Sequence, residues 1–284
     1  MNLSENTNWK SANVADLAFI LLSPSLIKDG KNTLVLNTTE IVEWLKKLDN
    51  NDAELQLFLA IKKVQKLGWY AEQLMAYFFT SYPGFNLLGN NIQLFEDKTT
   101  TGEIDFIVED LKTNQIIQIE LATKFYLYYD KFKDKGKIFI GPNATDNFDR
   151  KYHHLIENQL KKETPKEVLE ITNGRMIDAQ IPWVKGVLFY PLSQPDVIST
   201  FNYIHPNHTR GWFCSLADLQ MNEKLTKLSV FKKMDWLSLS ITEQIQKEQF
   251  NTYLSDLFTK GHRAVMVLNS KNERGFIMSD AWPN

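Results

Sequence analysis

The fold of this chain is decided by two neighbouring stretches, Gly102-Glu-Ile-Asp-Phe-Ile-Val-Glu109 and Gln115-Ile-Ile-Gln-Ile-Glu-Leu-Ala-Thr-Lys124. Apolar side chains occupy every second position from Ile104 to Val108, which is the period of a β-strand with two unlike faces. The second stretch has the same period. The segment 110–114 between them is polar and rich in turn residues. We therefore predict an antiparallel hairpin over these residues.

Such a hairpin would bring two acidic side chains, Asp105 and Glu120, within reach of a single hard cation. Glu120 stands in a run that is apolar on both faces, as in a strand that is buried on both sides. A carboxylate at such a position is costly unless it binds a metal or is paired. The alternative is an ordinary hairpin whose acidic residues lie on a solvated face.

A lysine follows on the same strand. Residues two apart in a strand share a face, so Glu120, Ala122 and Lys124 point the same way. Lys124 lies about 13 Å along the chain from Glu120, and its long side chain can lean back toward the acids. The alternative is a lysine that extends from the strand end into water. On the preceding strand, Glu103 shares the face of Asp105 and is a candidate to bind water or to assist.

A predicted helix upstream carries a further acid. In the stretch from Gly68 to Phe79, Glu72 shares one helical stripe with Met75 and Ala76, so it stands among apolar residues. The alternative is that Glu72 only favours the positive N-terminal end of this helix.

Taken together, these residues resemble the PD-(D/E)xK nuclease superfamily, and most closely its branches that read Gly-Glu-Ile-Asp and then Glu-x-Lys after a hairpin. The phrase Glu120-Leu-Ala-Thr-Lys-Phe-Tyr-Leu127 also looks like an uncharacterised bacterial family of that superfamily, domain of unknown function 1853. The resemblance implies a restriction-endonuclease-like α-β-β-β-α-β core and a nuclease that depends on Mg²⁺ or Mn²⁺.

The resemblance also implies the roles of single residues. Asp105 and Glu120 would bind the metal, and Glu72 would hold a second ion or a water. Lys124 would complete the catalytic set by orienting the attacking water or offsetting developing charge. In the superfamily pattern the lysine usually stands two residues after the glutamate, where this chain has Ala122. If the resemblance holds, its role has moved to Lys124.

Length and composition agree with a sizeable folded protein of mixed α/β class. The chain has 284 residues, and 43% of them are hydrophobic, which is enough for a large interior. We predict a helical N-terminal cover over residues 1–60, a nuclease-like core over 61–190 and a C-terminal α+β lobe over 191–284. Within this lobe, the periodicity of residues 242–257 predicts a helix.

A formal net charge of −2 does not indicate a nucleic-acid-binding protein. Any contact with nucleic acid must therefore come from a local patch. Basic residues follow the second strand, and aromatic residues precede them, a combination that suits phosphates and bases. The alternative is a solvated loop. The candidate contacts are Lys131, Lys133, Lys135, Lys137, Arg150 and Lys151.

Other features bound the location and the class. The single Cys214 excludes an intramolecular disulfide and fits a reducing compartment. The apolar stretch from Val14 to Leu22 is too short to span a bilayer. We expect a cytoplasmic protein with nucleic acid as its partner and no membrane association. A catalytically weakened module of the same fold that binds nucleic acid or protein, and an unrelated α/β enzyme, remain alternatives.

Overall fold

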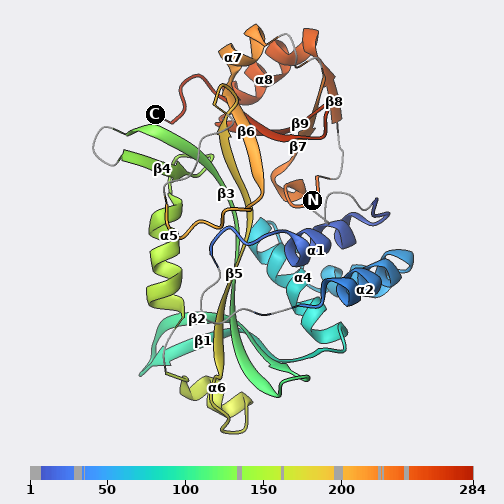
Figure 1. The fold of residues 1–284 in the computed structure, drawn as a ribbon, viewed down its shortest axis with the longest axis vertical. Helices are drawn as coiled ribbons and strands as arrows, with labels where there is room; N and C mark the ends of the chain where they lie inside the picture. The colour runs from blue at the N-terminus through green and yellow to red at the C-terminus, as the bar shows by residue number, and fades with distance from the viewer. Residues whose placement is uncertain are drawn as a thin grey trace. The chain divides into compact units, whose positions relative to one another are not determined.

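The chain folds into two compact units, described here from a computed structural model (Figure 1). The first unit comprises Met1–Thr123 with Tyr152–Lys185, and the second comprises Lys124–Lys151 with Gly186–Asn284. Together they give a mixed α/β fold, in which helices accompany a large mixed β-sheet. The structure describes residues 8–28, 34, 36–132, 136–160, 163–194, 201–222, 225, 227–239 and 243–283.

Among the described residues, four helices open the first unit, and the sequence predicts helices in this N-terminal part. Ser11 and Asn37 cap the first two helices, because their side chains accept hydrogen bonds from backbone N–H groups of the first turn. Within the described part of the chain, no helix has the length and apolar character needed to cross a membrane. The four helices are α1 (Ala12–Leu22), α2 (Thr38–Asn50), α3 (Ala53–Ile61) and α4 (Leu67–Ser81).

The strands of the first unit form an antiparallel meander. β1 (Phe85–Glu96) pairs with β2 (Thr99–Asp110), and β2 pairs with β3 (Gln115–Phe132). The predicted hairpin is therefore confirmed. Helix α4 packs against β1 and β2, with the ring centroids of Phe79 and Phe106 5.5 Å apart.

A short helix, α6 (Lys166–Ile171), also packs against β1. Its Val168 joins an apolar cluster that includes Ile107 of β2 and Ile116 of β3. The hairpin is therefore fixed by this packing as well as by its ladder of hydrogen bonds.

The segment before α6 consists of α5 (Phe148–His154) and a π-helical turn, η1 (Leu155–Gln159).

The second unit is built on strands with α7 (Leu216–Met221) and α8 (Phe250–Thr259) beside them, and these two helices lie side by side (Figure 1). β4 (Gly136–Ile140) pairs with β3, and the other strands follow in the order β5-β6-β10-β9-β7-β8. β6 runs parallel to β5 and to β10. The bounds are β5 (Ala179–Pro191), β6 (Arg210–Ser215), β7 (Lys227–Phe231), β8 (Glu243–Gln246), β9 (Ala264–Asn269) and β10 (Arg274–Met278).

The prediction of one helix over residues 242–257 is wrong at its start. Residues 243–246 form β8, which pairs antiparallel with β7, and the helix α8 begins only at Phe250. Glu243-Gln-Ile-Gln246 is too short and too polar to show its own period, so its extended form is decided by pairing with a distant strand.

Gly186 on β5 is required where this strand passes β3. Its φ of +138° lies in a region that residues with a side chain rarely adopt, and an added Cβ atom would collide with the backbone of Lys124. The absence of a side chain therefore fixes the close approach of β5 to β3 at Lys124.

Candidate functional site

The predicted acidic pair lies at the end of the β2–β3 ladder. The paired residues run from Asp110 opposite Gln115 to Phe106 opposite Ile119. Beyond that pair, a side chain makes the connection between the strands, because Oδ2 of Asp105 accepts a hydrogen bond of 2.8 Å from the backbone N–H of Leu121. The carboxylate of Asp105 therefore reaches across to β3 at the residue next to Glu120.

Glu120 is fully buried, and both of its carboxylate oxygens accept hydrogen bonds from glutamine side chains. Gln118 Nε2 donates to Oε1 at 2.9 Å, and Gln159 Nε2 donates to Oε2 at 3.1 Å. Gln118 Nε2 also donates to the backbone carbonyl oxygen of Gln159, at 3.0 Å. The oxygen Oε1 of Gln118 accepts from Gln180 Nε2 at 3.1 Å. Glu120 is thus held by the amides of Gln118 and Gln159, and Gln180 in turn holds the amide of Gln118.

The π-helical turn η1 positions Gln159. The backbone N–H of Leu160 donates to the carbonyl of Leu155, five residues earlier, at 3.1 Å. A turn of this kind holds one residue more than an α-helical turn and is often found at functional sites. Both the backbone carbonyl and the side-chain amide of Gln159 are turned toward β3 as a result.

Electrostatics link Glu72 of α4 to the same group of acids. Burial raises the pKa of the half-buried Glu72 to about 7, and the nearby carboxylates of Asp105 and Glu103 add to this rise. Burial also raises the pKa of Glu120 to about 8, with repulsion from Asp105 as the next cause. Asp105 therefore lies close enough to both glutamates to disfavour their ionised forms.

The acids that could supply ligands to a divalent cation are Asp105 and Glu120, and they do not form a complete cage. In the described residues, no three His, Cys, Asp or Glu side chains form a ready metal-binding group. Mg²⁺ is usually held by one or two carboxylates, and waters and substrate phosphates complete its shell. Asp105 and Glu120 match this pattern in number, and a cation would offset both the cost of burying the charge of Glu120 and its repulsion from Asp105, which raise the pKa of Glu120.

The remaining predicted residues have different environments. Lys124 is half-buried on β3 and is the first residue of the second unit. Glu103 is exposed and accepts a hydrogen bond from Gln93. Arg150 and Lys151 are exposed on α5. Lys133 and Lys135 lie outside the described residues, as do the side chains of Lys131 and Lys137.

The buried acids should make the stability of the metal-free protein depend on pH. Between the usual carboxyl pKa of 4.5 and about 8, folded Glu120 keeps a proton that the unfolded chain has released. Glu120 alone should lower the free energy of unfolding by about 1.4 kcal/mol for each pH unit in this interval, and the loss should end above a pH of about 8. Glu72 should add to the slope up to a pH of about 7. Urea unfolding at a series of pH values measures this slope.

The variant Asp105→Asn should end this loss of stability at a lower pH, because it removes a charge that adds to burial in raising the pKa of both Glu72 and Glu120. Glu96→Gln is the matched control, since Glu96 is an exposed acid at the end of β1. An Asp105→Asn protein whose loss of stability ends at the same pH as that of the control would contradict the assignment of Asp105 as the shared neighbour.

Comparison with known proteins identifies a family for the chain but no function. A family model described as a domain of unknown function, DUF1853, matches residues 15–280. No curated protein and no solved structure matches the chain.

Proposed function

The chain belongs to the DUF1853 family, whose description assigns no activity, and we propose from its acidic site that it is a divalent-metal-dependent nuclease with a PD-(D/E)xK-type core. The observation that carries this proposal is the position of Asp105. Its carboxylate reaches β3 beside the fully buried Glu120 and raises the pKa of Glu120 and of Glu72. Acids held together against their mutual repulsion are typical of functional sites.

In the proposed mechanism, Asp105 and Glu120 hold Mg²⁺ or Mn²⁺, which when bound would polarise the phosphate and lower the pKa of a bound water. The two glutamine amides fix the direction of the Glu120 carboxylate. Burial and the nearby carboxylates raise the pKa of Glu72 in the metal-free site, and its ionised form would accept a proton from an attacking water. Lys124 would offset charge that develops on the phosphate oxygens.

A metal titration tests the site. A divalent ion that binds only the folded state must raise the melting temperature by mass action. We expect Mg²⁺ or Mn²⁺ at concentrations of about 1–10 mM to raise it by several degrees. Asp105→Asn should abolish this shift, and Glu96→Gln should retain it. The shift should also grow as the pH rises toward about 8, because bound metal displaces the proton of Glu120.

A cleavage panel tests the activity. It comprises single-stranded and duplex DNA and RNA, each with and without the metal, and the expected result is metal-dependent cleavage of at least one of them. An unchanged melting temperature would overturn the metal site. A shift without cleavage of any nucleic acid would favour a binding module of the same fold, a reading that Ala122 at the usual lysine position also supports.

A further inference from the structure

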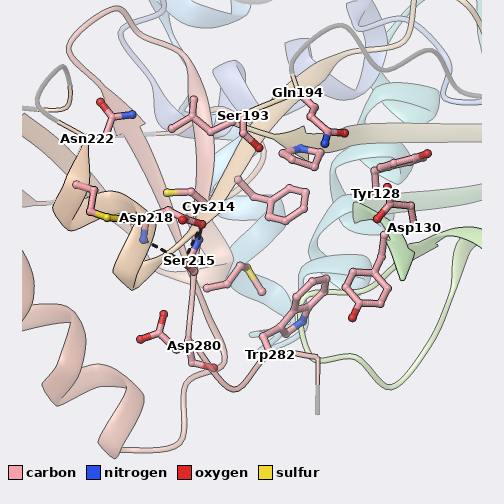
Figure 2. A pocket seen from close by; sticks show the side chains of 17 residues that line it. Tyr128, Asp130, Ser193, Gln194, Cys214, Ser215, Asp218, Asn222, Asp280 and Trp282 are labelled. Carbon is pink, nitrogen blue, oxygen red and sulfur yellow. Dashed lines mark hydrogen bonds between the residues drawn. The ribbon is translucent and has the colours of Figure 1, made fainter. Parts of the chain in front are cut away.

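The second unit contains a cavity whose polar groups do not identify a ligand. Its volume is about 850 Å³, and its walls include the β6–α7 junction and the residues that follow β10 (Figure 2). Ser215 Oγ donates to Oδ2 of Asp218 at 2.8 Å, and the backbone N–H of Ala217 donates to Oδ1 of Asp280 at 3.1 Å. Both acids are therefore engaged by donors of the chain itself.

A surface of the first unit shows a clearer chemical preference. It lies where α3 is followed by α4, and we call it the α3–α4 surface; its residues are Lys62, Lys63, Lys66 and Trp69. Trp69 is 49% exposed, although tryptophan is a side chain that folded proteins mostly bury. Nζ of Lys66 lies over its ring, 4.2 Å from the centroid. This cation–π contact holds the indole in place while about half of its surface stays open to solvent.

The lysines of the α3–α4 surface are free to meet an anion. All three are exposed, and none of them forms a salt bridge with another described residue. Nε2 of Gln73 donates to the backbone carbonyl oxygen of Lys62 at 2.7 Å. Gln73 lies four residues after Trp69, on the same stripe of α4. The hydrogen bond therefore brings Lys62 alongside the helix face that carries Trp69.

The α3–α4 surface also adjoins the acidic site. Glu72 follows Trp69 by three residues, so the two side chains are neighbours on the surface of α4. Burial and two carboxylates raise the pKa of Glu72, and the charge of Lys62 acts against them. Lys62 is therefore close enough for its field to reach Glu72. A polyanion that reaches the acids has these lysines beside its path.

From this arrangement we propose that the α3–α4 surface binds an unpaired nucleotide of a single-stranded nucleic acid. The base stacks on Trp69, and the phosphates on either side of it contact Lys62 and Lys63. An exposed aromatic ring beside cations is typical of proteins that bind single strands, because every base has a face that can stack. Bases inside a duplex already stack on each other and offer no such face. The inference rests on the proposed function, which gives the reason to expect nucleic acid beside Glu72, and it names single strands as the substrate class.

Fluorescence anisotropy in EDTA tests the surface without cleavage. Labelled single strands of DNA and of RNA, about 15 nucleotides long, are compared with a DNA duplex of the same sequence. Trp69→Leu should weaken binding of a single strand by about tenfold or more, the loss expected for one stacked base, and should change duplex binding by less than about twofold. Phe95→Leu is the matched control, since Phe95 is an aromatic residue of the same unit and is 45% exposed.

A salt titration tests the phosphate contacts. Each contact with a single strand contributes about 0.7 to the slope of log binding constant against log salt concentration. Lys62→Ala with Lys63→Ala should therefore reduce the steepness of this slope by about 1.4. Lys46→Ala with Lys47→Ala is the control, since these are two adjacent exposed lysines on α2 of the same unit. An equal slope in the two double variants would overturn the phosphate contacts.

The inference and the proposed nuclease can fail separately. A loss of single-strand binding in Trp69→Leu no larger than in Phe95→Leu, or an equal loss for the duplex, would overturn the inference even if the wild type cleaves nucleic acid with metal. Binding that depends on Trp69, without cleavage when metal is added, would support the surface and overturn the nuclease.

The wild type alone provides the last test. No binding of either single strand at about 100 μM would overturn the inference. If phosphatidylserine vesicles bind instead, the surface, together with exposed Leu57 and Ile61 of α3, would be assigned to lipid.

Discussion

Glu120→Gln is expected to lower nucleic-acid cleavage by at least about a thousandfold, because it removes one of two proposed metal ligands. The same change should make the metal-free protein more stable at pH 8 and above. A neutral amide carries no charge, so it is free of the cost of burying a charge and of the repulsion from Asp105, which together raise the pKa of Glu120 to about 8. The new carbonyl oxygen can keep the hydrogen bond from Gln118, and the side-chain amide of Gln159 can turn over to accept from the new NH₂ group. Cleavage assays and urea unfolding measure the two effects.

The combination of lost activity and gained stability distinguishes a functional acid from a structural one. If Glu120 only holds the fold together, Glu120→Gln should destabilise the protein. The rate of cleavage for each folded molecule should then be the same as in the wild type. Glu120→Leu is a useful companion, because it leaves the amide donors of Gln118 and Gln159 without acceptors and should destabilise the protein by about 1–3 kcal/mol or more.

Lys124→Ala is expected to lower turnover by roughly a hundredfold, the loss typical of one charge-stabilising donor. Metal-induced stabilisation should remain, because Lys124 is not a proposed ligand. Lys124→Arg should recover little, since a planar guanidinium cannot place a point charge in the same position. Initial rates of cleavage at saturating metal measure the effect.

A second substitution tests whether the role of the lysine has moved along β3. Ala122→Lys restores the usual spacing after Glu120, and in the Lys124→Ala background it should recover part of the activity. Full activity of Lys124→Ala alone would mean that Lys124 takes no part in the reaction.

The hairpin could be predicted from the sequence because its information is local. Alternation in residues 102–109 and 115–124 predicts two strands, and the structure pairs them antiparallel. The run of apolar residues around Glu120 predicts a buried strand, and Glu120 is fully buried. By contrast, β1 (Phe85–Glu96) was not predicted, because Gly89-Asn-Asn91 within it is typical of a turn.

The support of Glu120 by glutamines could not be predicted, because the residues that provide it are far apart in the sequence. Gln159, which donates to Glu120, lies 39 positions after it, and Gln180, which donates to Gln118, lies 60 positions after Glu120. No local pattern connects either of them to Glu120. One signal was present. Gln118 shares the face of Glu120 on an otherwise apolar strand, and a buried amide beside a buried acid indicates a hydrogen bond between them. The roles of Glu72 and Lys124 in catalysis stay predictions.

The π-helical turn also affects how this chain should be aligned with its relatives. The turn η1 contains one residue more than an α-helical turn. A relative with a regular helix at this place would therefore have one residue fewer before the side-chain amide that donates to Glu120. Counting along the sequence would then assign the equivalent of Gln159 to the wrong position. An alignment of the family should place its gap inside residues 155–159 and ask, relative by relative, which side chain supplies this donor.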